Sequence, residues 1–208
     1  MFQFIESIKM EDQKIFLLEY HQKRVNETFR QFGKETSIDL EKIFKNLQHD
    51  EDGLYKLRII YDLDRKYTTQ LIPYAIPEID DFQLVENNTI DYSFKYENRK
   101  EFSLMKEKAR TEEIIIVKNN RVTDTSFSNL LFLKGKEWFT PDTYLLNGVQ
   151  RQHLLKNKKI KETEITLQNL KEFTHFQIIN ALNDFDDMFI YPIHKIVNLP
   201  ESGEYMEL

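Results

Sequence analysis

Short strand-like segments joined by tight turns are the feature of this sequence that most restricts its fold. Residues 112–124 read EEIIIVKNNRVTD, in which two strand-like runs flank Asn119-Asn120, a pair typical of a tight β-hairpin turn. Further hairpins are predicted over residues 53–77 and 129–142. Because these connections are mostly hairpins, the chain is predicted to have an α+β fold and not a doubly wound parallel sheet.

The remaining elements are predicted from apolar periodicity and from helix-capping residues. Further strands are predicted over residues 2–10, 15–20, 81–87, 89–96, 174–182 and 188–199. Helices are predicted from Tyr20 to Phe32 with Gly33 as the stop, from Asp39 as a cap, over residues 99–110, and over residues 148–157.

The segment 89–96 combines a strand pattern with a reactive side chain. Apolar Ile90, Tyr92, Phe94 and Tyr96 alternate with polar residues, which predicts a strand buried on one face. Lys95 would end the polar face, at the mouth of a cleft between two lobes. We place the lobe boundary near residues 92–98 and divide the chain into lobes 1–94 and 95–208. A lysine at a strand edge is, by itself, most often only solvated.

The composition excludes several classes of protein. A net charge of −6 over 208 residues disfavours a protein built to bind nucleic acid, whose phosphates require a basic surface. The absence of cysteine excludes disulfides and thiolate nucleophiles. We find neither a signal peptide nor an apolar run long enough to span a bilayer. We therefore expect a cytoplasmic protein with no nucleic-acid and no membrane partner.

No metal site is predicted, because the spacing of possible ligands matches no metal-binding motif. The acidic pair Glu112-Glu113 is interpreted as part of a solvated turn. Surface or capping positions are expected for all five histidines: His21, His49, His153, His175 and His194.

Two further segments suggest contacts to a ligand. Asp124 precedes a run of small polar residues, so a flat ligand could approach the backbone while the carboxylate holds a protonated ring nitrogen. Gly148 opens a helix and leaves the amides of Val149 and Gln150 free to bind an anion. Taken alone, each segment is more often an ordinary turn or an ordinary helix start.

A second anion contact could come from Arg24, although helical arginines are mostly exposed. The order of these residues along the chain is more informative than any one of them. Arg24 is followed by Lys95, then by Asp124, then by Gly148 at a helix start, and finally by the run IINAL at residues 178–182.

This order resembles the class IV fold of pyridoxal-phosphate enzymes, which includes branched-chain and D-amino-acid aminotransferases and aminodeoxychorismate lyase. Residues 5–25 resemble the opening strands and the His-x-x-Arg helix of that family. KYENR (95–99) is similar to the lyase pattern Lys-His-Leu-Asn-Arg. VTDTSFSNLLF (122–132) and LLNGVQR (145–151) match two further family segments. The resemblance runs from Ile5 to Pro192 and implies a small N-terminal lobe beside a larger, barrel-like C-terminal lobe.

The resemblance also implies a role for each matched residue. Lys95 would bind pyridoxal 5′-phosphate covalently and afterwards move protons, while Asp124 would pair with the pyridine nitrogen. The phosphate would lie between Arg24, Gly148 and the amides of Val149 and Gln150. The resemblance also places Asn180 among the residues that would bind the cofactor.

The chain departs from the family pattern at three points. Asp124 replaces the usual glutamate, and Gln150 replaces the usual threonine. The segment that usually precedes the first matched strand is missing, which implies a trimmed small lobe.

The run Asn180-Ala181-Leu182 resembles the Cys-Asn-Ala-Leu stretch of the lyases, so the resemblance favours an aminodeoxychorismate lyase that forms pyruvate and 4-aminobenzoate for folate synthesis. Two alternatives stay open. One is a class IV aminotransferase acting on branched-chain or D-amino acids. The other is a non-catalytic binding protein of the same fold. The expected partners are a small amino substrate and a second copy of the chain in a homodimer.

Overall fold

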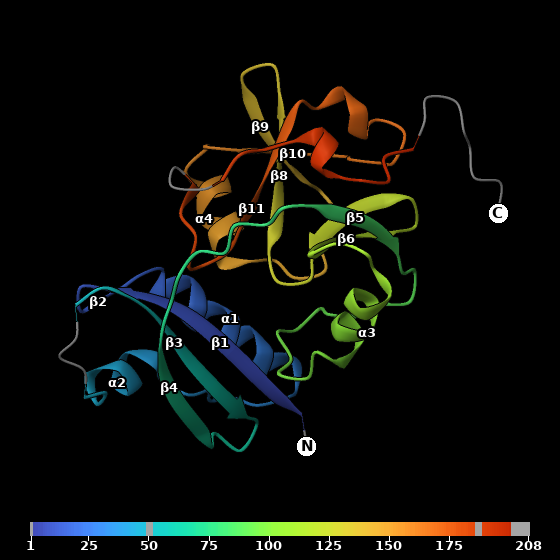
Figure 1. Ribbon diagram of the computed structural model, residues 1–208. Coiled ribbons are helices and arrows are strands. Elements are labelled where there is room, and N and C mark those ends of the chain that lie inside the picture. Colours follow the sequence, from blue (N-terminus) through green and yellow to red (C-terminus); the bar gives the residue numbers. More distant parts are fainter. Residues whose placement is uncertain (1, 49–51, 186–188, 201–208) are drawn as a thin grey trace.

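The computed structural model describes residues 2–48, 52–185 and 189–200. Its strands form two sheets that lie beside each other (Figure 1). The first sheet has the strand order β2-β1-β3-β4, and every neighbouring pair in it is antiparallel. Its strands are β1 (Gln3–Glu11), β2 (Lys14–Ile15), β3 (Leu54–Asp62) and β4 (Tyr67–Pro73).

Two helices, α1 (Leu18–Gln31) and α2 (Leu40–Lys45), pack on one face of the first sheet (Figure 1). The Asp39 side chain caps α2 by accepting a hydrogen bond from Lys42 N at 3.0 Å, as predicted. Gly33 follows the end of α1 with φ +70°, a conformation that favours glycine.

The predicted strand over residues 15–20 is mostly wrong. Pairing in β2 ends at Ile15, and Leu17 adopts a left-handed conformation with φ 53°. The chain therefore bends at Leu17 and enters α1 at Leu18, two residues before the predicted start of the helix.

The second sheet has the order β10-β9-β8-β7-β6-β5, with β11 pairing to β8 and β12 to β11. The hairpins β6–β7 and β8–β9 are antiparallel, as predicted, whereas β5–β6 and β9–β10 are parallel. Among the described residues these pairings do not close into a ring. The strands are β5 (Phe82–Glu86), β6 (Glu113–Lys118), β7 (Arg121–Thr125), β8 (Asn129–Lys134), β9 (Glu137–Pro141), β10 (Lys161–Thr163), β11 (His175–Ile179) and β12 (Tyr191–Pro192).

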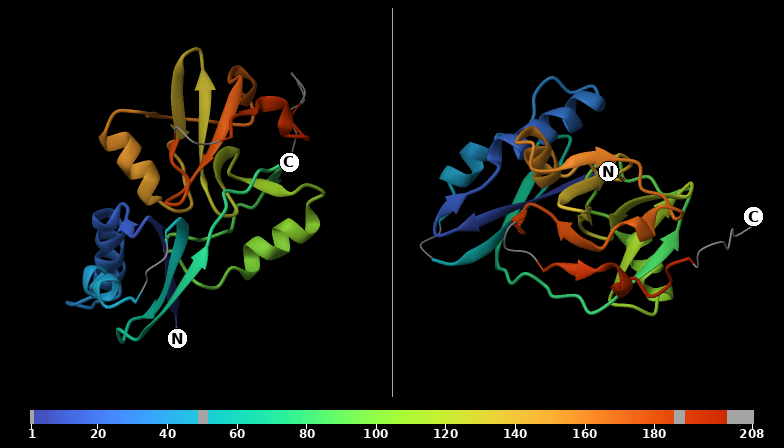
Figure 2. Two further views of the ribbon diagram at one scale, coloured as in Figure 1. Left: turned by 60° about the vertical axis from the view of Figure 1, so that its left-hand side comes forward. Right: turned by 90° about the horizontal axis from the view of Figure 1, so that it is seen from above.

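The predicted helices of the second half are α3 (Lys100–Lys108) and α4 (Val149–Lys156). Helix α4 lies against α1 where the two sheets meet, and the rings of Tyr20 and His153 are 5.7 Å apart there (Figure 2). Short 3-10 turns cover Leu170–Glu172 and Ile193–Lys195. No helix in the described part of the chain is long and apolar enough to cross a membrane.

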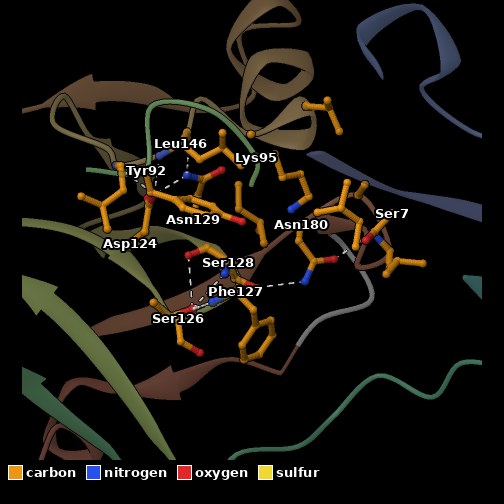
Figure 3. A pocket seen from close by; sticks show the side chains of 18 of the residues that line it. Ser7, Tyr92, Lys95, Asp124, Ser126, Phe127, Ser128, Asn129, Leu146 and Asn180 are labelled. Carbon is orange, nitrogen blue, oxygen red and sulfur yellow. Dashed lines mark hydrogen bonds between the residues drawn. The ribbon is translucent and has the colours of Figure 1, made fainter. Parts of the chain in front are cut away.

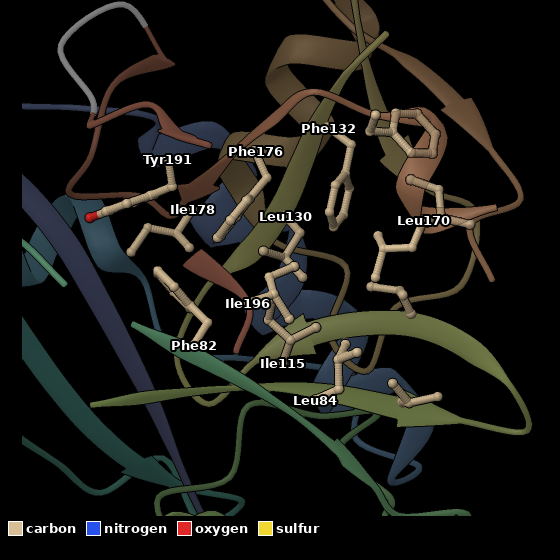
Figure 4. Packing of buried hydrophobic residues seen from close by; sticks show 14 of the residues in the cluster. Phe82, Leu84, Ile115, Leu130, Phe132, Leu170, Phe176, Ile178, Tyr191 and Ile196 are labelled. Carbon is tan, nitrogen blue, oxygen red and sulfur yellow. The ribbon is translucent and has the colours of Figure 1, made fainter. Parts of the chain in front are cut away.

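Aromatic and branched side chains fill the core of the second sheet (Figure 4). Phe82 from β5 meets Phe176 from β11 with ring centroids 4.8 Å apart, and Phe132 from β8 packs on the same ring. All three are fully buried. This packing fills the interior of the second sheet, whose β7–β8 turn and residues 179–182 line a cavity that also borders the first sheet.

The segment 89–96 is not a strand, contrary to prediction. Asn87 Oδ1 accepts hydrogen bonds from the amides of Thr89 and Ile90, and Asp91 Oδ1 accepts one from Ser93 N at 3.0 Å. These local bonds turn the backbone away from an extended conformation. The alternation nevertheless reports burial correctly, because Ile90 is buried while Asp91 and Ser93 are exposed.

The end of this segment joins the edge of β1. Ile5 N donates to Lys95 O, and Glu97 N donates to Gln3 O, each at 2.9 Å. The division into lobes 1–94 and 95–208 stays a prediction, although β5, which precedes residue 94, pairs in the second sheet. The predicted strand 188–199 contains only β12, and its first residue, Met188, lies outside the described residues.

Candidate active site

A cavity of about 460 Å³ lies between the two sheets (Figure 3). Its walls come from β1 and β3 of the first sheet, from the β7–β8 turn and residues 179–182 of the second, and from two connections at 92–99 and 145–149. Gln150 is buried but does not line the cavity. The other predicted site residues all do: Arg24, Lys95, Asp124, Gly148, Val149 and Asn180.

The amine of Lys95 faces this cavity without a hydrogen-bond partner in the described part of the chain. Burial, with the positive charges of Arg24 and Arg99, lowers its pKa to about 7, although Glu6 and Asp124 oppose the shift. An unprotonated amine is a nucleophile and a base. The fixed backbone of Lys95, bonded to Ile5, therefore carries a side chain suited to attack a carbonyl near neutral pH.

The carboxylate of Asp124, at the end of β7, is held in one orientation by three donors. Oδ2 accepts hydrogen bonds from Leu145 N and Leu146 N, each at 2.9 Å, and Oδ1 accepts one from Asn129 Nδ2 at 2.7 Å. The side chain is 5% exposed, and burial raises its pKa to about 6 although these bonds lower it. Above that pH it presents an oriented negative charge to the cavity.

Position 148 requires glycine because the Asn129 side chain lies close to it, and not because of its backbone conformation. Its φ of −64° and ψ of 146° are open to any residue. A Cβ at this position would lie 2.0 Å from Asn129 Oδ1, which is a severe clash. Because Asn129 also donates to Leu146 O at 2.9 Å, the glycine allows one amide side chain to join Asp124 to the loop before α4.

The start of α4 provides free backbone donors beside the cavity. Gly148 caps the helix without a side-chain hydrogen bond, and the first turn contains no acidic residue. The amides of a first helical turn have no intrahelical acceptor and carry the positive end of the helix dipole. Gly148 and Val149 line the cavity, so an anion there would meet these amides.

Arg24 is paired with a buried carboxylate that sequence reasoning missed. Its Nε donates to Glu6 Oε1 at 2.9 Å, and its Nη2 contacts Glu6 Oε2. Glu6 is fully buried and also contacts His21 Nδ1 at 2.5 Å. Burial raises the pKa of Glu6, but Arg24 and His21 outweigh this effect and lower it to about 2.

The expectation that His21 lies at the surface is wrong, because the side chain is fully buried against Glu6. Burial lowers its pKa. The sequence signal was present, since His21 and Arg24 are three residues apart and share a face of α1. His49 lies outside the described residues. No cluster suited to bind a metal ion occurs among the residues described.

A second charged network fixes the β7–β8 turn. Arg99 contacts the carbonyl of Ser126 and donates to Tyr92 Oη at 3.2 Å. Glu113 Oε1 accepts a hydrogen bond from Ser126 N at 2.9 Å, and Glu113 Oε2 accepts one from Lys106 Nζ at 2.8 Å. Glu113 is fully buried, so the expectation of a solvated turn is wrong for this residue.

Asn180 lies on the side of the cavity away from Asp124 (Figure 3). Its Nδ2 donates to Ser128 Oγ at 2.9 Å, and its Oδ1 accepts a hydrogen bond from Leu182 N at 2.8 Å. These bonds fix the turn after β11 against the β7–β8 turn.

A cavity amine, an oriented carboxylate and the start of a helix thus lie around one cavity. The family model of class IV aminotransferases matches residues 3–196. An uncharacterised protein from Haemophilus influenzae is 34% identical over 189 residues, which cover 88% of this chain and 99% of that protein. The chain belongs to the class IV aminotransferase family.

Two solved structures illustrate the relationship. A Haemophilus somnus 129PT protein, provisionally described as a 4-amino-4-deoxychorismate lyase, is 34% identical with a TM-score of 0.81, over 88% of this chain and 98% of that one. A hypothetical aminotransferase from Mycobacterium tuberculosis, solved with pyridoxal phosphate bound, has a TM-score of 0.71 at 14% identity, over 95% and 83% of the two chains. The predicted fold and family are thereby confirmed.

Enzymes of this family depend on pyridoxal 5′-phosphate, which is therefore the cofactor here. The residues present fit this group. Lys95 offers an amine for the aldehyde, Asp124 offers an acceptor for the ring nitrogen, and the start of α4 offers amides for the phosphate.

Proposed function

We propose that this protein is a pyridoxal-phosphate-dependent lyase that converts aminodeoxychorismate into pyruvate and 4-aminobenzoate for folate synthesis. The proposal rests chiefly on the reactive amine of Lys95 in one cavity with Asp124 and the start of α4. The lyase is favoured by the run Asn180-Ala181-Leu182, which lines this cavity. The similarity to the Haemophilus somnus protein over nearly its whole length supports the same choice.

The protein contributes binding groups and a base. When bound, the cofactor withdraws electron density from the carbon that carries the substrate nitrogen, which makes its proton acidic. Lys95 Nζ, unprotonated above a pH of about 7, removes that proton. The enolpyruvyl group leaves the neighbouring carbon and takes up a proton to become pyruvate, while the ring becomes aromatic.

The other residues hold and tune the cofactor. Asp124 accepts a hydrogen bond from the ring nitrogen and keeps it protonated, as its own three donors fix the carboxylate in place. The amides at the start of α4, together with Arg24, bind the phosphate. Asn180 limits the cavity on the side opposite Asp124.

A class IV aminotransferase is the second candidate. It would use the same cofactor residues, and Lys95 and Asp124 line the cavity as such an enzyme requires. A non-catalytic binding protein is less favoured, because a cavity lysine with a pKa of about 7 is suited to chemistry and not only to binding.

The decisive assay measures pyruvate released from aminodeoxychorismate in the absence of any keto acid. Pyruvate is followed through lactate dehydrogenase and NADH, with Lys95→Ala as the matched control. We expect steady release by the wild-type enzyme and none by the variant. Amino transfer that requires an added keto acid would identify an aminotransferase. Inactivity in both assays, with bound cofactor, would indicate a binding protein.

We further propose, from the resemblance alone, that the enzyme is a homodimer of the cytoplasm. Light scattering coupled to size-exclusion chromatography would test the dimer, and cell fractionation would test the location.

A further inference from the structure

The face of the first sheet that lines the cavity carries three cations on adjacent strands. Lys56 and Arg58 are two residues apart in β3, so their side chains leave the sheet on the same face, while Leu57 between them enters the core. In the register of β1 and β3, Lys9 lies opposite Lys56 and Ser7 opposite Arg58. Like charges directly opposite each other destabilise a sheet unless anions compensate them.

Two of these three cations have carboxylate partners within the chain. Lys9 Nζ lies 2.6 Å from Asp184 Oδ2 and 3.0 Å from Glu11 Oε2. Arg58 Nη2 lies 3.0 Å from Glu97 Oε1. The intramolecular partners therefore account for the charges of Lys9 and Arg58.

Lys56 is different. In the part of the chain that the structure describes, it pairs with no carboxylate, and its ammonium lies over the ring of Tyr74 at 5.6 Å from the centroid. Lys56, Arg58 and Tyr74 all line the cavity that Lys95 faces. An unpaired ammonium beside a guanidinium at a ligand cavity is suited to bind an anion.

We propose that Lys56, with Arg58 beside it, binds a carboxylate of the substrate that is distant from the reacting amine. The inference rests on the proposed function and specifies its substrate class. The substrate would be a ring compound with an amine on one ring carbon and a carboxylate on the opposite one, as in 4-aminobenzoate and its precursor. Lys56 offers three donors, and Arg58 keeps donors beyond those that reach Glu97 and Gln70 Oε1.

The same feature opposes a branched-chain amino acid as substrate. Such a molecule has one carboxylate, next to the reacting carbon, and an apolar side chain beyond it. Packing that side chain against Lys56 would remove water from an ammonium without replacing it by an anion, which is costly. The subsite therefore favours the lyase substrate over that of a branched-chain aminotransferase.

The test compares two ligands of similar shape, one of them anionic and the other neutral. Cofactor-loaded enzyme is titrated by calorimetry with 4-aminobenzoate and with the neutral 4-aminobenzamide. We expect the acid to bind about tenfold or more tightly than the amide, as charge-assisted hydrogen bonds require. Lys56→Gln should remove most of this difference and Lys56→Arg should keep it. Lys66→Gln, at an exposed cation in the β3–β4 turn, should bind like the wild type.

The outcomes separate the subsite from the reaction. Equal binding of the acid and the amide by the wild type, or unchanged binding in Lys56→Gln, overturns the subsite even if pyruvate is released from aminodeoxychorismate. Selective binding that depends on Lys56, in an enzyme that releases no pyruvate, supports the subsite and rejects the lyase.

Discussion

The guanidinium of Arg24 and the carboxylate of Glu6 form a buried ion pair beside the cavity, with Glu6 fully buried and His21 as its second partner. The cation assigned to the cofactor phosphate is therefore held in place by an acid on β1. Removing either member leaves the other charge buried and uncompensated.

We expect Glu6→Gln to lower the free energy of unfolding by about 3 kcal/mol at pH 7, since breaking a buried pair costs this much. The pKa of Glu6 is about 2 in the folded protein against an ordinary 4.5. Its contribution is therefore complete above pH 4.5 and is lost as the pH falls from 4.5 towards 2. Urea unfolding at several pH values checks both effects.

Glu41→Gln is the matched control, because Glu41 pairs with Lys45 at an exposed site and its loss should change stability little. Equal stability of Glu6→Gln and wild type at pH 7 would contradict the role of the pair.

Cofactor affinity is best measured in Arg24→Lys. Arg24→Ala would leave the buried Glu6 carboxylate without a cationic partner, whereas Arg24→Lys keeps a positive charge beside it. We expect the affinity for the cofactor to fall in Arg24→Lys.

Covalent attachment of the cofactor should follow the protonation of Lys95. Because its pKa is about 7, the attachment rate, followed by visible absorbance, should rise with pH through 7 and then level off. An ordinary lysine would become steadily more reactive towards pH 10. Borohydride reduction followed by peptide mapping should label Lys95, and a label on Lys100 or Lys106 instead would refute the assignment.

Asp124→Asn should bind the cofactor and lose activity by about a hundredfold or more, the range typical of removed electrostatic partners. The amide cannot keep the ring nitrogen protonated. It also cannot accept from Asn129 and from both loop amides together, because one of its two polar atoms is a donor. Steady-state kinetics at saturating cofactor measures the loss. Wild-type turnover in this variant would leave the carboxylate a structural role only.

Gly148→Ala should weaken cofactor binding, because the added Cβ would displace Asn129 and, with it, its bonds to Asp124 and Leu146. Equilibrium dialysis measures the cofactor affinity. Gly135→Ala serves as the control, since Gly135 has φ +64° in a distant hairpin, where the substitution strains the backbone without touching the site. If both variants bind the cofactor equally well, the close contact between Gly148 and Asn129 is not needed for cofactor binding.

Local chemistry explains which parts of the fold could be predicted. Asn119 and Asn120 adopt φ values of 51° and 64°, so the residues that signal the hairpin also form its turn. The segment 89–96 was misread because the side chains of Asn87 and Asp91 compete for backbone amides, which the apolar alternation does not reveal. The parallel pairing of β5 with β6 depends on contacts distant in sequence.

The candidate site shows the same division. The order of Arg24, Lys95, Asp124 and Gly148 along the chain predicted a shared site, and the fold brings all four to one cavity. Their roles stay predictions. The supporting partners were not predictable, because each lies at a distance set by the fold: Glu6 is 18 residues from Arg24, and Leu145 is 21 residues from Asp124.

The hydrogen bond from Ile5 N to Lys95 O has a mechanical consequence. It fastens the reactive lysine to the same sheet as Lys56 and Arg58, whereas Asp124 lies in the second sheet and α4 packs against that sheet. If the residues have the proposed roles, a cofactor that is joined to Lys95 and held through its ring nitrogen and phosphate contacts both sheets. It would then act as a cross-link between the first sheet and the second.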